Sequence, residues 1–293
     1  MELNLVRIQI NVSPQSFQAA CDCLLSGKGS VFEQRLRHLL CERPGVVCSV
    51  CDQKQLCPVV VLTGRVLATD PELIRRHQKP GLPYMFSRSA DDQSVMLTAV
   101  GVASQMTDQL ITVIKSCLGT AALRSLIPVD YQATPFVSSY SPQDATSNLP
   151  VLSLSELFEQ HVPPYLGCQK LAVTMKTPLR LMSNSRELTR FDAAVFVRAL
   201  LRRLSAMIAY YGDFNQSDMI RSLAASADSI RIVAVDRSDS GMYASMRGIT
   251  GRFVLSGLFE ELGPYIALGS LLNLGKGAAY GMGQFSVAPV VER

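Results

Sequence analysis

The sequence predicts an α+β protein of two tandem ferredoxin-like (RRM-like) domains, each with an antiparallel sheet. The chain has 293 residues, 48% of them hydrophobic, and is therefore long enough to bury two cores of ordinary size. In both halves the hydrophobic periodicity predicts the order strand, helix, strand, strand, helix, strand, which is that of the split βαβ unit. A polar stretch at residues 132–150 separates the two halves.

The N-terminal half opens with a strand, because apolar and polar residues alternate from Val6 to Val12. Ser30 and Glu33 form the capping-box pattern at the start of a helix that ends near Cys41. The spacing of apolar residues predicts five further elements: a helix at 15–25, a short buried strand at 59–62, a strand at 95–102, a helix at 104–117 and a strand at 124–131.

Residues 132–150 are rich in Ser, Pro, Gln and Asn and contain few large apolar side chains, which is typical of a linker. A short helix at 154–160 and the pair Pro163 and Pro164 lead out of it. We therefore predict three regions: an N-terminal domain with a cysteine loop at 1–135, a linker at 136–167 and a C-terminal domain with a glycine-rich loop at 168–293.

The C-terminal half repeats the pattern. Its first strand is indicated by Leu171, Val173 and Met175, which alternate with smaller or polar residues. A long helix from about Phe191 to Tyr211 has one apolar stripe. The remaining elements are predicted as strands at 229–236 and 249–257, a helix at 260–272 and a last strand at 284–291.

Charge is distributed unevenly along the chain, whose formal net charge is +4. Residues 168–293 carry 15 basic and 10 acidic side chains, so the basic excess lies in the predicted C-terminal domain. This balance permits an anionic partner without requiring one, because a binding footprint depends on charges that cluster on one face. The sequence shows no run of 18 apolar residues and no signal-peptide pattern, so we expect a cytoplasmic protein without a membrane partner.

Four of the eight cysteines lie close together in the sequence: Cys41, Cys48, Cys51 and Cys57. A chain in the reducing cytosol is not expected to form a disulfide framework. Two thiolates in a Cys-x-x-Cys pair can reach one tetrahedral metal ion, which makes zinc the natural candidate. Alternatively, these cysteines are small buried or idle thiols in a loop. The sequence leaves both interpretations open.

The most informative stretch is the glycine-rich segment at 269–285. It does not fit the nucleotide-binding P-loop, because five residues separate Gly269 from Gly275 and because a glycine follows Lys276. It does not fit a dinucleotide-binding fingerprint either, since no further βαβ unit follows Gly283. Glycines can adopt positive φ and bring amide groups close to phosphate oxygens. The segment therefore predicts either a contact with RNA backbone or a tight structural turn.

The segment at 269–285 resembles the C-terminal glycine-rich loop of the repeat-processing endoribonucleases of CRISPR systems, which belong to the RAMP superfamily. Stretches upstream of it are similar to this family in order and spacing: Thr177–Arg180, Phe191–Asp192, Leu200–Leu204, Tyr210–Gly212 and Gly251–Gly257. The resemblance covers about residues 168–288. The N-terminal half is similar more loosely, through Gly29, the basic helix at 34–38 and the cysteine loop.

The resemblance implies that the protein cleaves CRISPR precursor RNA inside each repeat, without a catalytic metal ion, and releases guide RNAs. In such a reaction the 2′-hydroxyl upstream of the scissile phosphate attacks in line and leaves a cyclic phosphate and a 5′-hydroxyl. The chemistry needs a base for the attacking hydroxyl, a cation for the charge on the phosphorane and an acid for the leaving oxygen. A histidine with a pKa near neutrality suits the first or the last role.

Three histidines are candidates for this role. His38 lies in a basic helix one turn from Arg35, near the position where family members often carry a catalytic histidine, so it is the first choice. His77, beside two arginines, is the second, and His161 is expected to be structural. An ordinary solvated helix residue is the alternative interpretation of His38.

The predicted contacts with repeat RNA or crRNA lie in the C-terminal half. Arg231 and Arg252 alternate with apolar residues on two predicted strands and can face RNA. The other candidates lie in the glycine-rich segment: Gly275, Lys276, Gly277, Tyr280, Gly281 and Gly283. Two alternatives to the enzyme remain, namely a catalytically inactive crRNA-binding or scaffold subunit of a CRISPR effector complex, and a cysteine-metal protein without an RNA role.

Overall fold

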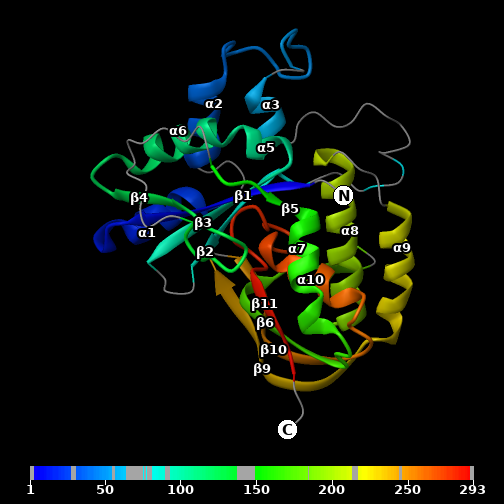
Figure 1. The fold of residues 1–293 in the computed structure, drawn as a ribbon. Helices are drawn as coiled ribbons and strands as arrows, with labels where there is room; N and C mark the ends of the chain where they lie inside the picture. Colours follow the sequence, from blue (N-terminus) through cyan, green and yellow to red (C-terminus); the bar gives the residue numbers. More distant parts are fainter. Residues whose placement is uncertain are drawn as a thin grey trace.

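The computed structural model describes residues 3–27, 31–54, 57–63, 75, 77, 81–89, 93–136, 149–183, 185–212, 217–243 and 246–290. Its helices and strands form two α/β units, one from each half of the chain, and each unit is built on an antiparallel sheet (Figure 1). The predicted α+β class with two ferredoxin-like domains is therefore confirmed. No helix within the described ranges is both long and apolar enough to cross a membrane.

The N-terminal sheet has the strand order β2-β3-β1-β4, which is the ferredoxin-like order. Its strands are β1 (Asn4–Val12), β2 (Tyr84–Arg88), β3 (Ser94–Val100) and β4 (Leu123–Pro128). The helices on this half are α1 (Phe17–Leu24), α2 (Val31–Leu40), α3 (Pro58–Leu62), α5 (Val102–Gln105) and α6 (Thr107–Leu118), preceded by the 3₁₀ turn η1 (Pro14–Ser16). Apolar side chains of β1, such as Ile8 and Ile10, are buried against α1, α2 and α6.

Two predictions for this half need correction. Residues 59–62 are not a strand but belong to helix α3, because Pro58 fits the first position of a helix and the valines that follow it pack into the core. The second strand of the sheet is instead β2, which the sequence analysis did not identify. Ser30 of the predicted capping box lies outside the described residues.

Part of the predicted linker is regular structure. The described chain resumes at residue 149 with β5 (Leu152–Ser153), which pairs with β1, and continues with α7 (Leu154–His161) and the 3₁₀ turn η2 (Pro163–Tyr165). A capping box starts α7, because Ser153 and Glu156 exchange hydrogen bonds between side chain and backbone. Residues 137–148 lie outside the described part, so their assignment as a linker stays a prediction.

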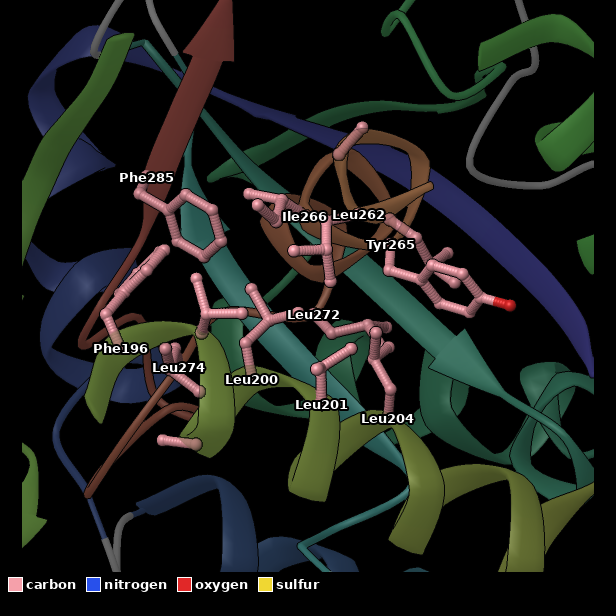
Figure 2. Close-up of a cluster of buried hydrophobic side chains, with 14 of the residues drawn as sticks. Phe196, Leu200, Leu201, Leu204, Leu262, Tyr265, Ile266, Leu272, Leu274 and Phe285 are labelled. Atoms are coloured by element: carbon pink, nitrogen blue, oxygen red, sulfur yellow. The ribbon is translucent and has the colours of Figure 1, made fainter. Parts of the chain in front are cut away.

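The C-terminal sheet has the strand order β11-β6-β10-β9, again the ferredoxin-like order. Its strands are β6 (Lys170–Leu179), β9 (Arg231–Tyr243), β10 (Met246–Ser256) and β11 (Phe285–Pro289). Its long helix is α8 (Ala193–Tyr211), and the shorter α10 (Leu262–Leu271) packs in the same core. Figure 2 shows leucines of α8 beside α10 and Phe196 of α8 beside Phe285 of β11, within one buried core.

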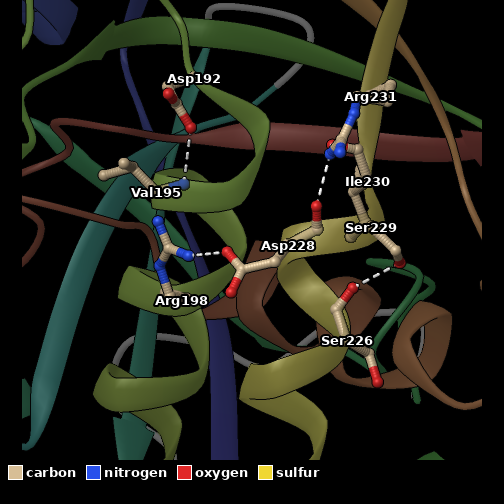
Figure 3. A network of polar contacts seen from close by, with 8 residues as sticks. All are labelled: Asp192, Val195, Arg198, Ser226, Asp228, Ser229, Ile230 and Arg231. Atoms are coloured by element: carbon tan, nitrogen blue, oxygen red, sulfur yellow. Dashed lines mark hydrogen bonds and ion pairs between the residues drawn. The ribbon is translucent and has the colours of Figure 1, made fainter.

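Smaller elements complete this half: the hairpin of β7 (Met182–Ser183) and β8 (Arg186–Glu187), the helix α9 (Ser217–Ser226) and the 3₁₀ turn η3 (Ala227–Ser229). Asp192 caps the long helix, since its carboxylate accepts a hydrogen bond of 2.8 Å from the amide of Val195. Beside this cap, Arg198 pairs with Asp228 and so ties α8 to η3 (Figure 3).

Candidate functional site

The glycine-rich loop, residues 273–283, connects α10 to β11 and has an unusual backbone. Asn273, Gly275, Gly277, Gly281 and Gly283 all have positive φ. A Cβ atom on Gly283 would lie 1.8 Å from the carbonyl oxygen of Leu274, and one on Gly275 would lie 2.3 Å from that of Arg180. Glycine is therefore required at both positions, for its dihedral angles and for the close approach of another backbone segment.

Most amide groups of the loop already have partners inside the protein. The amides of residues 276, 278, 280, 281, 282 and 283 donate to backbone carbonyl groups, over distances of 2.9 to 3.4 Å. The hydroxyl of Thr177 adds a further bond, 2.6 Å long, to the carbonyl of Gly281. These hydrogen bonds favour the interpretation of the segment as a structural turn. RNA binding by Gly275, Gly277, Gly281 and Gly283 stays a prediction.

The loop rests on strand β2 of the other half of the chain. The amide of Phe86 donates to the carbonyl of Ala279 at 2.9 Å, and the side-chain amide of Asn273 donates to the carbonyl of Phe86 at 3.0 Å. Nearby, the side-chain amide of Gln284 donates to the carbonyl of Arg88 at 2.7 Å. The loop is therefore part of the junction between the two sheets.

Tyr280 points into this junction and not towards solvent. Its side chain is 7% exposed, and its hydroxyl donates a hydrogen bond to the carboxylate of Glu33 on α2, which is equally buried. Burial raises the pKa of Tyr280 above its ordinary value, and the contact with Glu33 adds to this effect. An aromatic ring must be exposed to stack on a base, so this placement does not present the ring of Tyr280 for stacking, and RNA binding by Tyr280 stays a prediction.

His38 lies in the last turn of α2 and its side chain is exposed. The same solvent-facing side of the helix carries Arg35 and Arg37, while Phe32 and Leu36 are buried on the opposite side. An imidazole in this position is accessible to a substrate and has positive charge beside it. The arrangement suits proton transfer at a phosphate group.

His77 has a different environment. Its side chain is 6% exposed, and its Nδ1 atom lies 3.2 Å from the hydroxyl of Ser205 on α8. The ring also meets the edge of Tyr210. His77 is thus buried between the two halves of the chain. The side chain of His161 lies outside the described residues.

The predicted basic contacts are exposed but separate. Lys276 projects from the tip of the glycine-rich loop, and Arg252 lies on β10 with Thr174 and Asp236 as its neighbours in the register. The guanidinium of Arg231 donates to the carbonyl groups of Asp228 and Ile230, so it is partly occupied by its own strand end (Figure 3).

Arg203 lies within the stretch Leu200–Leu204 that is similar to the family. The structure buries its guanidinium, which donates two hydrogen bonds, of 2.9 and 3.2 Å, to the carbonyl of Leu272 just before the glycine-rich loop. Burial lowers the pKa of Arg203 to about 10. Arg203 therefore holds the chain at the start of the glycine-rich loop, and its guanidinium is not available to RNA.

The four cysteines of the N-terminal loop, Cys41, Cys48, Cys51 and Cys57, line one cavity of about 370 Å³ between α2 and α3. In the described part of the chain, no three side chains of Cys, His, Asp or Glu are grouped closely enough to hold a metal ion. Zinc binding would therefore have to draw the thiols together, and the zinc site stays a prediction.

Sequence reasoning did not identify Glu33 and Asn273 as members of this site. Glu33 was interpreted as a capping residue from its distance to Ser30, and nothing in the local sequence indicates its partner 247 residues away. Asn273 had a usable signal, because an asparagine just after the end of a helix often takes the left-handed conformation that closes it.

Comparison with known proteins finds a sequence match to one protein family in the C-terminal half of the chain. Residues 173–285 match the family model described as CRISPR-associated endoribonuclease Cas6. A search of curated protein sequences gives no match. Twenty solved chains are similar in structure.

Three of these structures illustrate the likeness. A Cas6 product complex is 13% identical over 97% of this chain and 99% of the other, with a TM-score of 0.53. The Cas6 of Thermus thermophilus is 15% identical over 98% of both chains, with a TM-score of 0.50. A chain of a partial Cas6-RT-Cas1–Cas2 complex is 13% identical, with a TM-score of 0.56, and this protein covers 47% of it.

At such low identities the structural matches show the fold, and the family model adds the sequence pattern of the C-terminal half. Both point in the same direction as the motifs at 177–180 and 269–285. Residues 173–285 are thus similar in sequence to the Cas6 endoribonuclease family, and the fold of the chain is similar to that of solved Cas6 proteins.

Proposed function

We propose that this protein binds CRISPR repeat RNA and cleaves the precursor transcript by attack of a 2′-hydroxyl, without a catalytic metal ion. The observation that carries the proposal is the exposed imidazole of His38 on the basic side of α2, in a chain whose residues 173–285 match the Cas6 family model. His77 is a weaker candidate, because its burial against α8 keeps it from a substrate. His38 is therefore the proposed general base or general acid.

In the proposed reaction, one proton leaves the attacking 2′-hydroxyl and one proton reaches the 5′ oxygen as the bond from phosphorus to that oxygen breaks. The phosphorane carries extra negative charge between these two events, and a cation beside it lowers the barrier. Arg35 and Arg37 lie on the exposed side of the helix that carries His38 and are the proposed source of this charge. The products are a 2′,3′-cyclic phosphate and a 5′-hydroxyl.

RNA binding is proposed to depend on side chains more than on loop amides, since most of those amides bond within the protein. Lys276, Arg252 and Arg231 are exposed and can contact phosphate groups. Other CRISPR proteins are proposed as further partners, because the fold is similar to part of a Cas6-RT-Cas1–Cas2 complex. The site of action is expected to be the cytoplasm.

The test is a cleavage assay with repeat RNA in the presence of EDTA. The wild-type protein is expected to produce cyclic phosphate ends, and His38→Ala to reduce the rate by about 100-fold or more, as expected for loss of a general acid or base. His77→Ala is the matched control and should retain the rate if the protein is folded. Tight RNA binding by a wild-type protein that does not cut would instead support an inactive crRNA-binding subunit.

A further inference from the structure

Helix α2 and the glycine-rich loop meet in the interior although they are far apart in the sequence. The hydroxyl of Tyr280 reaches from the loop to the carboxylate of Glu33 in the first turn of α2. Both side chains are 7% exposed, so water does not compete strongly for this hydrogen bond. A hydrogen bond to a buried carboxylate is costly to break, because the carboxylate then loses a partner in a medium of low polarity.

A second connection runs through strand β2. The ring of Phe32 on α2 packs edge-on against Phe86 and Tyr84 of β2, with centroid distances of 4.9 and 5.6 Å. The backbone of Phe86 in turn bonds to the loop at Ala279 and accepts from Asn273. Two adjacent residues of α2, Phe32 and Glu33, are therefore held by the same junction, one by packing and one by a hydrogen bond.

The position of α2 matters because of what lies on its other side. His38 follows Glu33 by five residues, somewhat more than one turn, and faces solvent. Phe32 and Leu36 pack α2 into the N-terminal core, and the hydrogen bond from Tyr280 adds a directional contact at the first turn of the helix. Loss of this hydrogen bond would therefore move the imidazole of His38 relative to the loop and to Lys276.

We propose that Tyr280 is a positioning residue, which acts through Glu33 to hold α2, and with it His38, in register with the glycine-rich loop. This inference rests on the proposed function of His38. It assigns to Tyr280 a role in the rate of the chemical step and not in RNA affinity. Catalytic groups must be placed to within a fraction of an ångström, so a small shift of the helix has a measurable effect on the rate.

The test compares variants that differ by single polar atoms. Tyr280→Phe removes the hydroxyl and keeps the ring. Glu33→Gln keeps an oxygen that can accept the hydrogen bond from Tyr280. Tyr84→Phe is the matched control, because it removes a hydroxyl from the same buried cluster, and among the described residues this hydroxyl has no hydrogen-bond partner.

Single-turnover cleavage and RNA affinity are measured for each variant. Tyr280→Phe is expected to slow cleavage by about 10- to 100-fold with an unchanged Kd for repeat RNA. Tyr84→Phe and Glu33→Gln are expected to cleave at close to the wild-type rate. Wild-type cleavage by Tyr280→Phe would overturn the inference, and so would a loss of RNA affinity as large as the loss of rate.

Hydrogen exchange at the amides of α2 gives a readout that does not need activity. Tyr280→Phe is expected to exchange faster than wild type at residues 31–40, and Tyr84→Phe is expected to match wild type. If the wild-type protein cleaves no repeat RNA, the proposed function fails. The hydrogen-exchange experiment then tests by itself whether Tyr280 holds α2. Unchanged exchange in Tyr280→Phe would overturn that part as well.

Discussion

The side-chain amide of Asn273 donates to two carbonyl groups that belong to different halves of the chain, Phe86 at 3.0 Å and Ala278 at 2.9 Å. Asn273 is itself 2% exposed and has a φ of 50°, which asparagine tolerates better than most residues. One residue thus ends α10, shapes the glycine-rich loop and attaches it to β2.

Replacing this amide should therefore be costly. Asn273→Asp keeps the size of the side chain but places a second oxygen next to two carbonyl oxygens, so we expect a loss of about 2–4 kcal/mol in the free energy of unfolding. Urea denaturation measures it. Asn11→Asp is the control, because the amide of Gln9 already donates to Asn11 and the other partner, the hydroxyl of Ser125, can turn and donate. Equal losses for the two variants would contradict this account.

Alanine substitutions at Gly283 and Gly119 distinguish the cost of a strained backbone dihedral from the cost of a steric clash. Both have positive φ, but a Cβ on Gly283 would meet Leu274 at 1.8 Å, whereas one on Gly119 would have no atom within 4 Å. We expect Gly119→Ala to cost about 1–3 kcal/mol from strain alone. Gly283→Ala should cost clearly more, since the loop must also shift. Thermal unfolding checks the order, and a smaller loss at Gly283 would show that the loop adapts.

Lys276 should contribute to RNA affinity as a single charge. Lys276→Ala is expected to weaken binding to all RNA sequences and to reduce the slope of log K against log salt by about 1. Fluorescence anisotropy at several salt concentrations measures this slope. Lys115→Ala, on helix α6 of the other half, is the control and should leave it unchanged. An unchanged slope for Lys276→Ala would remove Lys276 from the interface.

The buried phenol of Tyr280 predicts loss of stability at alkaline pH. Because burial and Glu33 raise its pKa above the ordinary value of 10.0, the folded state keeps the proton more tightly than the unfolded chain. The resulting stability is complete below about pH 10 and decreases as the pH rises further. Tyr280→Phe should lose stability less steeply between pH 10 and 11.5 in urea titrations. Identical slopes would show that the phenol does not titrate on unfolding.

The cysteine loop is expected to bind zinc after its thiols move together. Purified protein should contain about one zinc ion per chain, and Cys48→Ser and Cys51→Ser should lose it, because structural zinc needs four ligands. Cys168→Ser, far from this loop in the sequence, is the control. If elemental analysis finds no zinc in the wild-type protein, the four cysteines are plain thiols.

The sequence predicts structural features that depend on neighbouring residues, but it does not predict features that depend on residues far along the chain. The alternation in β1 and the stripe of α8 indicated both elements correctly, because each periodicity reflects one buried face. Residues 59–62 were assigned to the wrong class, since a short apolar run fits a strand or a helix equally well.

The same limit applies to the site. The glycines at 275 and 283 were identified because positive φ restricts residue type locally. The burial of Tyr280 and His77 was missed, because each depends on a partner more than 100 residues away. Likeness to a family located the loop but did not indicate which of its groups face inward.

The hydrogen bonds between β2 and the glycine-rich loop also set an order of assembly. Ribosomes make the first half of the protein long before residues 273–285, so the N-terminal sheet must wait for the loop that completes its contacts. A nascent chain released before Asn273 would lack that loop, β11 and the support beneath α2. Such a fragment should be unable to hold α2, and with it His38, in the position that the complete protein gives it.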